Sequence, residues 1–325
     1  MIVTVTPNPS IDRTVTLPTP LTRGAVHRVT SVTSQAGGKG VNVARVLTLA
    51  GVDALAVLPA AAHDPLLSAL QASAVSYRVV QTAEPARINL AITEPDGTTT
   101  KINEPGAALD APTVAALTDA VLDAANGAEW VVMSGSLPPG VPTSWYGDVV
   151  ALLASRPCRV AVDTSDAPLA SLVGSLDRGA PDLIKPNAEE LASVLGYSPE
   201  LLEHAVAQGD PEPVVTAARQ LIDKGVGAVL ATLGAEGAVL VDRNGAWMAT
   251  PPPIVPRSTV GAGDSSLAGY IRAEVGGAMP PQRLQMAVAY GSAAAALPGT
   301  TLPTPVEIDL NAVQVSPISP IPANQ

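Results

Sequence analysis

Short apolar runs alternate with segments of helical periodicity along most of this chain, and this alternation restricts its fold more than any other feature. Six runs are typical of buried strands: Ile2–Thr6, Ala54–Leu58, Trp130–Ser134, Arg159–Asp163, Leu183–Lys185 and Ala228–Thr232. Five segments between them have a helical pattern: Gly40–Ala50, Thr113–Ala125, Ser144–Arg156, Ala188–Leu195 and Val214–Lys224. The sequence therefore predicts an α/β fold with a mostly parallel sheet between helices, in which ligands bind beyond the carboxyl ends of the strands.

Two early segments interrupt this rhythm. Thr14–Val32 is β-like without a convincing helix, and Arg87–Asn103 holds two β-like runs around a Glu-Pro-Asp-Gly turn, which indicates a hairpin. We expect residues 13–34 and 87–104 to form a small separate sheet, which covers a cleft as a lid or pairs with a second subunit. Extra edge strands on the main sheet are the alternative.

The C-terminal end differs in composition from the rest of the chain. From Leu302 onward it contains five prolines: Pro303, Pro305, Pro317, Pro320 and Pro322. Proline lacks a backbone N–H and resists regular structure, so this density predicts an extended or loose tail. We expect one domain over residues 1–315 and a proline-rich tail over residues 316–325.

Charge and composition exclude several classes of protein. The 325 residues carry a net charge of −11 without a Lys/Arg stripe, which argues against nucleic-acid binding. The N-terminus does not resemble a signal peptide, and no apolar run approaches the roughly 18 residues of a membrane helix. Cys158 is the only cysteine, so no intrachain disulfide can form. We expect a cytoplasmic enzyme that does not bind a membrane.

The segment Ser258–Tyr270 carries the strongest chemical signal. A β-like approach ends in Gly261-Ala262-Gly263, and Asp264 then opens a helical run. Glycine-flanked backbone N–H groups at a helix N-terminus can cradle a phosphoryl group, and the adjacent carboxylate can accept a proton from an attacking hydroxyl. The alternative is that Asp264 is an ordinary N-cap residue.

Three further candidates lie in the first third of the chain. In the run Ala36–Arg45, glycines surround Lys39 directly before a helix, which suits an anion, and Asn42 could bind hydroxyls. Asp12 follows the first strand, where a carboxylate could bind two sugar hydroxyls. Arg87 precedes the hairpin and could clamp a phosphate. Ordinary turns and exposed surface cations are the alternatives for these residues.

Two candidates lie in the second half. Leu183–Leu191 ends a strand in Lys185-Pro-Asn187 and begins a helix with Glu189 and Glu190, which either suit the helix dipole or hold Mg²⁺ through water. Ala231–Ala238 is a glycine turn between two strands that could approach nucleotide phosphates. The three histidines are scattered without metal-ligand spacing, and we assign none of them to catalysis.

Together these motifs resemble the ribokinase-like (PfkB) family of carbohydrate kinases over roughly residues 1–300. The motifs, in the order of the family, are PNPSID (7–12), GGKGVN (37–42), SGSLPPG (134–140), KPNAEEL (185–191), TLGAEG (232–237) and STVGAGDS (258–265). The resemblance implies a ribokinase-like three-layer α/β/α sandwich with a small β-sheet lid, and a homodimer formed through that lid.

The resemblance also implies an activity. It is the transfer of a phosphoryl group from ATP, with Mg²⁺, to the 6-hydroxyl of fructose 1-phosphate. Tagatose 6-phosphate and fructose 6-phosphate are alternative acceptors, and a nucleoside is disfavoured because Lys39 and Arg87 suit an anionic acceptor. An alternative from another class is a non-catalytic sensor of sugar phosphates or nucleotides, although such a sensor would not need Asp264.

The family pattern assigns roles to individual residues. Asp264 is the expected catalytic base, and the expected anion hole comprises Gly261, Ala262 and Gly263. The residues expected to bind the sugar phosphate are Asp12, Gly38, Lys39, Asn42, Arg87 and Ser136. Those expected to contact ATP are Lys185, Asn187, Thr232, Leu233, Gly234, Ala235, Glu236, Gly237, Gly263 and Ser292. Glu190 is expected to place Mg²⁺ through water.

Overall fold

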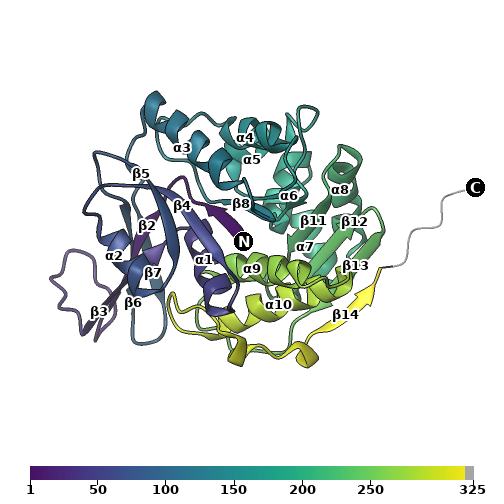
Figure 1. Cartoon of the computed structure of the whole chain (residues 1–325). Helices are drawn as coiled ribbons and strands as arrows, with labels where there is room; N and C mark the ends of the chain where they lie inside the picture. The colour runs from purple at the N-terminus through teal and green to yellow at the C-terminus, as the bar shows by residue number, and fades with distance from the viewer. Residues whose placement is uncertain (319–325) are drawn as a thin grey trace, which may run out of the picture.

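The structure, a computed structural model, describes residues 1–318 and is built around a ten-stranded sheet (Figure 1). Its strand order is β14-β13-β12-β11-β10-β9-β8-β1-β4-β5. The parallel strands are β1 (Ile2–Val5), β4 (Ala54–Ala60), β5 (Ser76–Gln81), β8 (Trp130–Ser134), β9 (Arg159–Asp163), β10 (Leu183–Ile184) and β11 (Ala228–Thr232). The antiparallel strands are β12 (Ala238–Asp242), β13 (Gly245–Thr250) and β14 (Gln314–Pro317). The predicted mostly parallel sheet is confirmed.

Helices cover both faces of this sheet because successive strand side chains point to opposite sides. In β1, Val3 and Val5 enter one apolar cluster and Ile2 enters the other. The first cluster is covered by α3 (Ala111–Ala124), α4 (Trp145–Leu153), α5 (Asp166–Val173), α6 (Ala188–Leu195), α7 (Pro199–Ala207) and α8 (Glu212–Asp223). The second is covered by α1 (Lys39–Leu49), α2 (Pro65–Ala72), α9 (Ala262–Val275) and α10 (Pro280–Ala296). The three-layer α/β/α arrangement is therefore confirmed.

A second, four-stranded sheet stands apart from the first, as the sequence predicted. Its order is β3-β2-β6-β7, with the strands β3 (Ser31–Gly37), β2 (Ser10–Thr16), β6 (Arg87–Thr93) and β7 (Thr99–Asn103). The alternative of extra edge strands on the main sheet is therefore wrong. Residues 17–30 form a loop rather than the expected continuous β-like segment. Pro18, Pro20 and Gly24, which has φ 79°, interrupt strand pairing there.

The two faces of the small sheet differ sharply in chemistry. The pairings Asp12↔Asn89 and Thr14↔Ala91 place polar or small groups on one face, which borders a cavity of about 660 Å³ shared with the loop at residues 256–260. On the opposite face, the polar residues Arg13, Ser34 and Thr100 lie among five apolar residues, which are Val15, Val32, Leu90, Ile92 and Ile102. We call these five residues the apolar face of the small sheet.

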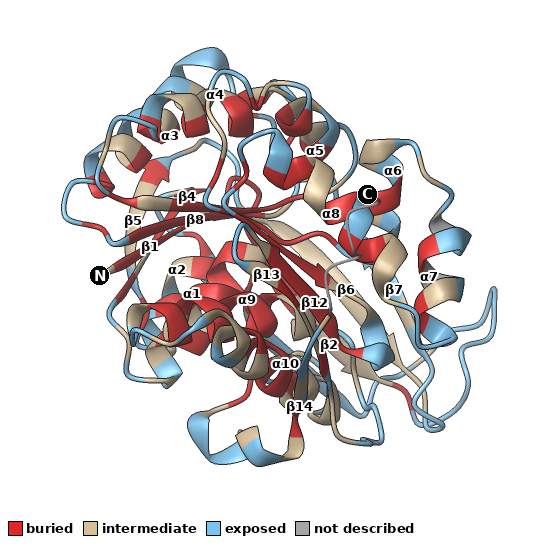
Figure 2. Cartoon of the chain, turned by 90° about the vertical axis from the view of Figure 1, so that its right-hand side faces the viewer, coloured by how far each residue is buried: buried red, intermediate tan, exposed pale blue. Residues whose placement is uncertain are grey.

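Burial distinguishes the two sheets. Figure 2 shows β1, β4 and β8 mostly buried, whereas β6 and β7 are intermediate or exposed. On the apolar face, Val32 and Ile102 are each 55% exposed. The small sheet thus has an apolar surface that the chain leaves partly uncovered, most of all at Val32 and Ile102.

The segment from Leu302 is more ordered than its proline content predicted. Two 3₁₀ turns, Pro305–Glu307 and Leu310–Ala312, lead into β14, which pairs with β13 at the edge of the main sheet. Proline has no backbone N–H to donate to a neighbouring strand. An edge strand tolerates Pro317 because the backbone groups on its outer side pair with no other strand. The expected tail begins inside this strand, and its residues 319–325 lie outside the described residues. Within residues 1–318, no helix combines the length and the apolar character needed to cross a membrane.

Candidate active site

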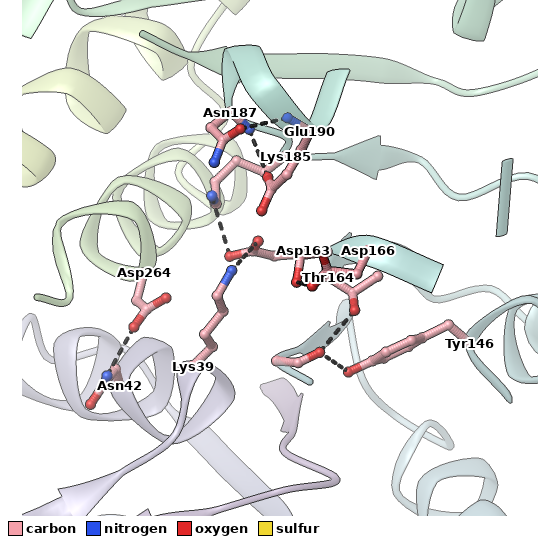
Figure 3. Close-up of polar contacts among 12 residues, drawn as sticks. Lys39, Asn42, Tyr146, Asp163, Thr164, Asp166, Lys185, Asn187, Glu190 and Asp264 are labelled. Carbon is pink, nitrogen blue, oxygen red and sulfur yellow. Dashed lines mark hydrogen bonds and ion pairs between the residues drawn. The ribbon is translucent and has the colours of Figure 1, made fainter. Parts of the chain in front are cut away.

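The amino end of α9 brings Asp264 to the carboxyl end of the main sheet. Gly261 caps the helix in the left-handed region, at φ 77°, and the helix begins at Ala262. Asp264 therefore lies in the first turn rather than opening the helix. Its Oδ2 accepts a hydrogen bond of 2.9 Å from Nδ2 of Asn42 on α1, as Figure 3 shows. The N-cap interpretation is wrong, because the carboxylate reaches another helix instead of capping its own.

The surroundings of Asp264 favour a carboxylate that can act as a base. Burial raises its pKa to about 6, and the negative charge of Asp163 acts in the same direction. Lys39, the Asn42 hydrogen bond and Lys185 oppose this increase without cancelling it. A carboxylate with a pKa of about 6 is ionised at neutral pH and still accepts a proton more readily than an exposed aspartate.

Asp163, at the carboxyl end of β9, is a site residue that the sequence analysis missed. Its Oδ1 accepts a hydrogen bond of 3.0 Å from Nζ of Lys39, and its Oδ2 lies 3.3 Å from Nζ of Lys185. The two lysines reach it from different elements, Lys39 from the start of α1 and Lys185 from the residue after β10 (Figure 3). One buried carboxylate therefore joins a lysine expected at the sugar phosphate to a lysine expected at ATP.

Mutual attraction between Asp163 and the two lysines, Lys39 and Lys185, keeps the buried carboxylate ionised. Burial acts to raise the pKa of Asp163, but the ammonium groups of Lys185 and Lys39 hold it below its usual value. In return, Asp163 is the main reason that the pKa of Lys39 is raised. The signal for Asp163 was present in the sequence, because a predicted parallel strand, Arg159–Asp163, ends in a carboxylate where ligands bind.

Asp12 belongs to a small polar network on the small sheet. Its Oδ1 accepts hydrogen bonds from the Ser10 hydroxyl at 2.7 Å and from the Asn89 amide at 3.0 Å. Gly37 lies against this carboxylate so closely that a Cβ atom would come within 2.3 Å of it. Gly38 has φ 102°, which favours glycine at the N-terminus of α1. Because Gly37 and Gly38 have no side chains, the backbone between β3 and α1 can lie directly against Asp12.

Arg87 and Ser136 are the two remaining residues that are expected to bind the sugar phosphate. Nη1 of Arg87 donates to the carbonyl of Glu104 at 3.1 Å, and Nε is buried without a hydrogen-bond partner among residues 1–318. Burial lowers the pKa of Arg87. Ser136 accepts a hydrogen bond of 3.2 Å from Nδ2 of Asn8. A partly buried guanidinium with a free Nε donor suits an anionic ligand.

A cavity of about 620 Å³ adjoins the start of α9 and is large enough for a nucleotide. Its walls include Ala262 and six of the residues expected to contact ATP: Thr232, Gly234, Ala235, Gly237, Gly263 and Ser292. Three others, Asn187, Leu233 and Glu236, line a neighbouring cavity of about 390 Å³. Lys185 lies next to Gly263. A Cβ atom added at Gly263 would lie 3.3 Å from Nζ of Lys185. The structure therefore gathers these residues around one region but divides them between two cavities.

Asn187 and Glu190 form a capping box at the start of α6. The Asn187 side chain accepts from the backbone N–H of Glu190 at 2.7 Å, and Oε2 of Glu190 accepts from the backbone N–H of Asn187 at 2.8 Å. Within residues 1–318, no group of three or more His, Cys, Asp or Glu side chains is arranged to hold a metal ion. A hard cation bound through one carboxylate, water and substrate phosphates fits this donor set, whereas an all-protein metal cage does not.

The three-layer fold, with polar groups and a cavity at the carboxyl ends of its parallel strands, is that of an α/β protein that binds small ligands. Comparison with known proteins identifies the family. Residues 5–307 match the pfkB family of carbohydrate kinases, and the chain belongs to this family. It is 36% identical to a 1-phosphofructokinase of Rhodobacter capsulatus, over 94% of this chain and 93% of the relative. It is 33% identical to ATP-dependent 6-phosphofructokinase isozyme 2 of Escherichia coli strain K12, over 93% and 94%.

A solved structure supports the same assignment. Phosphofructokinase-2 from Escherichia coli in complex with substrates and products superposes with a TM-score of 0.85 at 31% identity, covering 94% of this chain and 96% of that one. The ribokinase-like fold that the motifs implied is thus confirmed, and the chain is a carbohydrate kinase.

Proposed function

We propose that this chain transfers the γ-phosphoryl group of ATP, as its Mg²⁺ complex, to the 6-hydroxyl of fructose 1-phosphate. The products are fructose 1,6-bisphosphate and ADP. The observation that carries the proposal is Asp264, a buried carboxylate with a pKa of about 6 in the first turn of α9, beside a cavity of about 620 Å³. Similarity to 1-phosphofructokinases over most of the chain supports this choice of acceptor.

The first step of the proposed mechanism is proton removal. Asp264 accepts the proton of the acceptor hydroxyl as that oxygen attacks the γ-phosphorus, and Asn42 keeps the carboxylate oriented through its 2.9 Å hydrogen bond. The N-terminus of α9, with Gly261, Ala262 and Gly263, stabilises the negative charge of the transferring group. Bound Mg²⁺ supplies further neutralisation of phosphate charge, and Glu190 is the carboxylate that would hold it through water.

The sugar phosphate binds between the small sheet and the main sheet. Lys39 and Arg87 bind its phosphate, while Asp12, Asn42 and Ser136 bind its hydroxyls and Gly38 allows close backbone approach. The buried free donor of Arg87 favours an anionic acceptor over a nucleoside. The nucleotide binds in the larger cavity, with its phosphates toward Gly263 and Lys185.

A second candidate is 6-phosphofructokinase activity, which the relative and the solved structure from Escherichia coli support. The furanose ring of fructose is nearly symmetric, so one cleft could hold a phosphate at either end. Tagatose 6-phosphate is a third candidate acceptor.

A coupled ADP-release assay tests the proposal directly. It compares fructose 1-phosphate, fructose 6-phosphate and tagatose 6-phosphate at fixed Mg·ATP. We expect the highest kcat/KM with fructose 1-phosphate. Preference for a 6-phosphate would overturn the acceptor and retain the role of Asp264, whereas no turnover with any of the three would favour a non-catalytic sensor.

We also propose that two copies of this chain pair through the apolar face of the small sheet, so that the sheet is both lid and dimer interface. The support is the exposure of Val32 and Ile102 on a face where Val15, Leu90 and Ile92 are also incompletely buried. Exposed apolar patches of this kind mark association sites.

A further inference from the structure

The loop at residues 135–140 directly follows β8 and carries Ser136, one of the residues proposed to bind the sugar phosphate. The loop begins at Gly135, which has φ 113°, a conformation that favours glycine and that no side chain of its own stiffens. A Cβ atom added at Gly135 would lie 3.9 Å from Cβ of Lys39. The backbone of Gly135 therefore lies beside Lys39 and sets the position from which Ser136 projects.

Both backbone groups of Gly135 are held by hydrogen bonds. Its N–H donates to the carbonyl of Asp163 at 2.9 Å, which joins the loop to the end of β9. Its carbonyl accepts two hydrogen bonds, from the hydroxyl of Thr164 at 2.9 Å and from the hydroxyl of Tyr146 at 2.8 Å (Figure 3). A carbonyl oxygen has two lone pairs, so these two donors use its full capacity.

Tyr146 reaches Gly135 from a different element. It is the second residue of α4, its side chain is completely buried, and its ring packs edge-on against Trp145 with the ring centroids 5.4 Å apart. Burial raises the pKa of Tyr146, so its hydroxyl stays protonated at physiological pH and remains able to donate. Because a close-packed ring has little freedom to move, this donor fixes the Gly135 carbonyl relative to α4.

We infer that Tyr146 is a positioning residue for the sugar phosphate: its hydroxyl, together with that of Thr164, holds the Gly135 carbonyl so that Ser136 is in place to bind the acceptor. The inference rests on the proposed function of this site. Ser136 is exposed, and its hydroxyl accepts from Nδ2 of Asn8 at 3.2 Å, the long end of the usual range. The direction of this hydroxyl therefore depends on the backbone that carries it.

The inference separates the two substrates. Among the described residues, none of residues 134–140 lines the cavity of about 620 Å³ that we propose for the nucleotide. A less rigid loop should therefore weaken binding of the sugar phosphate and leave binding of ATP unaltered. A purely structural role for Tyr146 would lower the unfolding midpoint without this difference between the substrates.

Tyr146→Phe removes the hydroxyl and keeps the ring. We expect KM for fructose 1-phosphate to rise about 3- to 10-fold, the size of one neutral hydrogen bond, while kcat and KM for Mg·ATP stay within about twofold. Tyr77→Phe, on β5, is the matched control because its hydroxyl also makes one hydrogen bond, from Gln71. An unchanged KM for the sugar phosphate, or an equal rise in both KM values, would overturn the inference and leave the proposed function intact.

The same variants distinguish failure of the proposed function. If fructose 1-phosphate binds without being turned over, the proposed function fails, and calorimetric Kd values for fructose 1-phosphate decide the inference by the same limits. If another ketohexose phosphate is preferred, only the acceptor changes, and the comparison is made with that acceptor. If none of the three sugar phosphates reacts or binds, the proposed function and the inference both fail.

The second donor provides a test in which the hydroxyl can be restored. Thr164→Val removes the hydroxyl and keeps the branched shape, whereas Thr164→Ser keeps the hydroxyl. We expect Thr164→Val to raise KM for the sugar phosphate about as much as Tyr146→Phe does, and Thr164→Ser to stay within about twofold of the native value. Equal rises in the two Thr164 variants would show that packing decides, and would overturn the inference.

A double-mutant cycle tests whether Tyr146 acts through Ser136. Ser136→Ala removes the hydroxyl that the loop presents, so Tyr146→Phe has little left to misplace when it is added to this variant. We expect it to raise KM for the sugar phosphate by less than about twofold in that background, so the two changes should not be additive. Fully additive effects would show that Tyr146 acts by another route and would overturn the inference.

Discussion

The main sheet and the small sheet hold the candidate site residues in opposite physical settings. At the carboxyl ends of the main sheet, Asp163 and Lys185 are almost completely buried, and Asp264 on α9 is 6% exposed. On the small sheet, Arg87 and Asn89 are only partly buried, and Val32 and Ile102 of the apolar face are exposed. Charge interactions are strong in the first setting and screened by water in the second.

This difference suggests a division of labour. The main sheet and α9 hold Asp163, Lys185 and the proposed base Asp264 as buried charges, so a change there should affect both chemistry and stability. The small sheet presents groups to a ligand or to a partner, so a change there should affect binding and association while the fold persists. The following predictions test that contrast, beginning with the largest expected effect.

Asp264→Asn should lower kcat by about 10³-fold or more, because the acceptor hydroxyl loses its base, while ATP binding changes little. The same variant should be more stable than the native chain above pH 6. Folding raises the pKa of Asp264 from 3.8 to about 6, so the folded chain holds this proton more tightly than the unfolded chain does. The native chain therefore loses stability as the pH rises from about 4 to 6, and the asparagine variant does not. We expect a gain of about 1–2 kcal/mol at pH 8, measured by urea unfolding.

The exposed Asp119 of α3 provides the matched control. Asp119→Asn should alter neither turnover nor stability measurably. Turnover of Asp264→Asn within tenfold of the native value would remove Asp264 as an essential base.

Asp163→Asn should destabilise the chain by about 3 kcal/mol, because it leaves the buried ammonium of Lys185 and the partner Lys39 without their counter-charge. It should also raise KM for both the sugar phosphate and ATP, because we propose Lys39 as a ligand of the first and Lys185 as a ligand of the second. Urea unfolding and steady-state kinetics measure the two effects. Asp148→Asn breaks an exposed ion pair with Arg178 and should cost less than about 1 kcal/mol. Equal losses in the two variants would contradict the proposed role of Asp163.

Arg87→Ala should raise KM for the sugar phosphate by about 10- to 100-fold, the loss expected for charge-assisted hydrogen bonds, with a smaller change in kcat. Stability should be nearly unchanged because the Arg87 side chain is only partly buried. Arg13, on the other face of the same sheet, is exposed, and Arg13→Ala is the control. An unaltered KM in Arg87→Ala would exclude Arg87 from the phosphate site.

The pH dependence of kcat/KM should report on Asp264. The base must be ionised, so activity should rise with pH and reach half its maximum near pH 6. Asn42→Ala removes a hydrogen bond to the ionised carboxylate, and the midpoint should move upward by about one unit. A variant with lower kcat and an unshifted midpoint would indicate that Asn42 only packs against Asp264.

Changes on the apolar face should have the smallest effect on chemistry. The double variant Val32→Ser and Ile102→Ser should dissociate the proposed dimer, as sedimentation velocity would detect. Because both side chains are 55% exposed, the stability of the individual chain should change by less than about 1 kcal/mol. Thr33→Ser, on the opposite face of β3, is the control. A native chain that sediments as a monomer at micromolar concentration would refute the interface.

The fold class could be predicted from the sequence, and so could many residues of the candidate site. Apolar periodicity is local, so strands such as Trp130–Ser134 and helices such as Ala188–Leu195 were predicted with the bounds that the structure has. Local rules failed where long-range pairing decides. They extended β structure across residues 17–30, and they did not foresee that Gln314–Pro317 would pair with β13.

What the sequence by itself determined was the type of chemistry, through short motifs at the carboxyl ends of predicted strands, with Asp264 foremost. Only the tertiary structure decided which charges meet. Lys39 reaches Asp163 across 124 positions and Asn42 reaches Asp264 across 222, and no local pattern specifies such pairs. The physical reason is that a pKa and an ion pair depend on burial and on distance through space, which chain folding sets and sequence spacing does not.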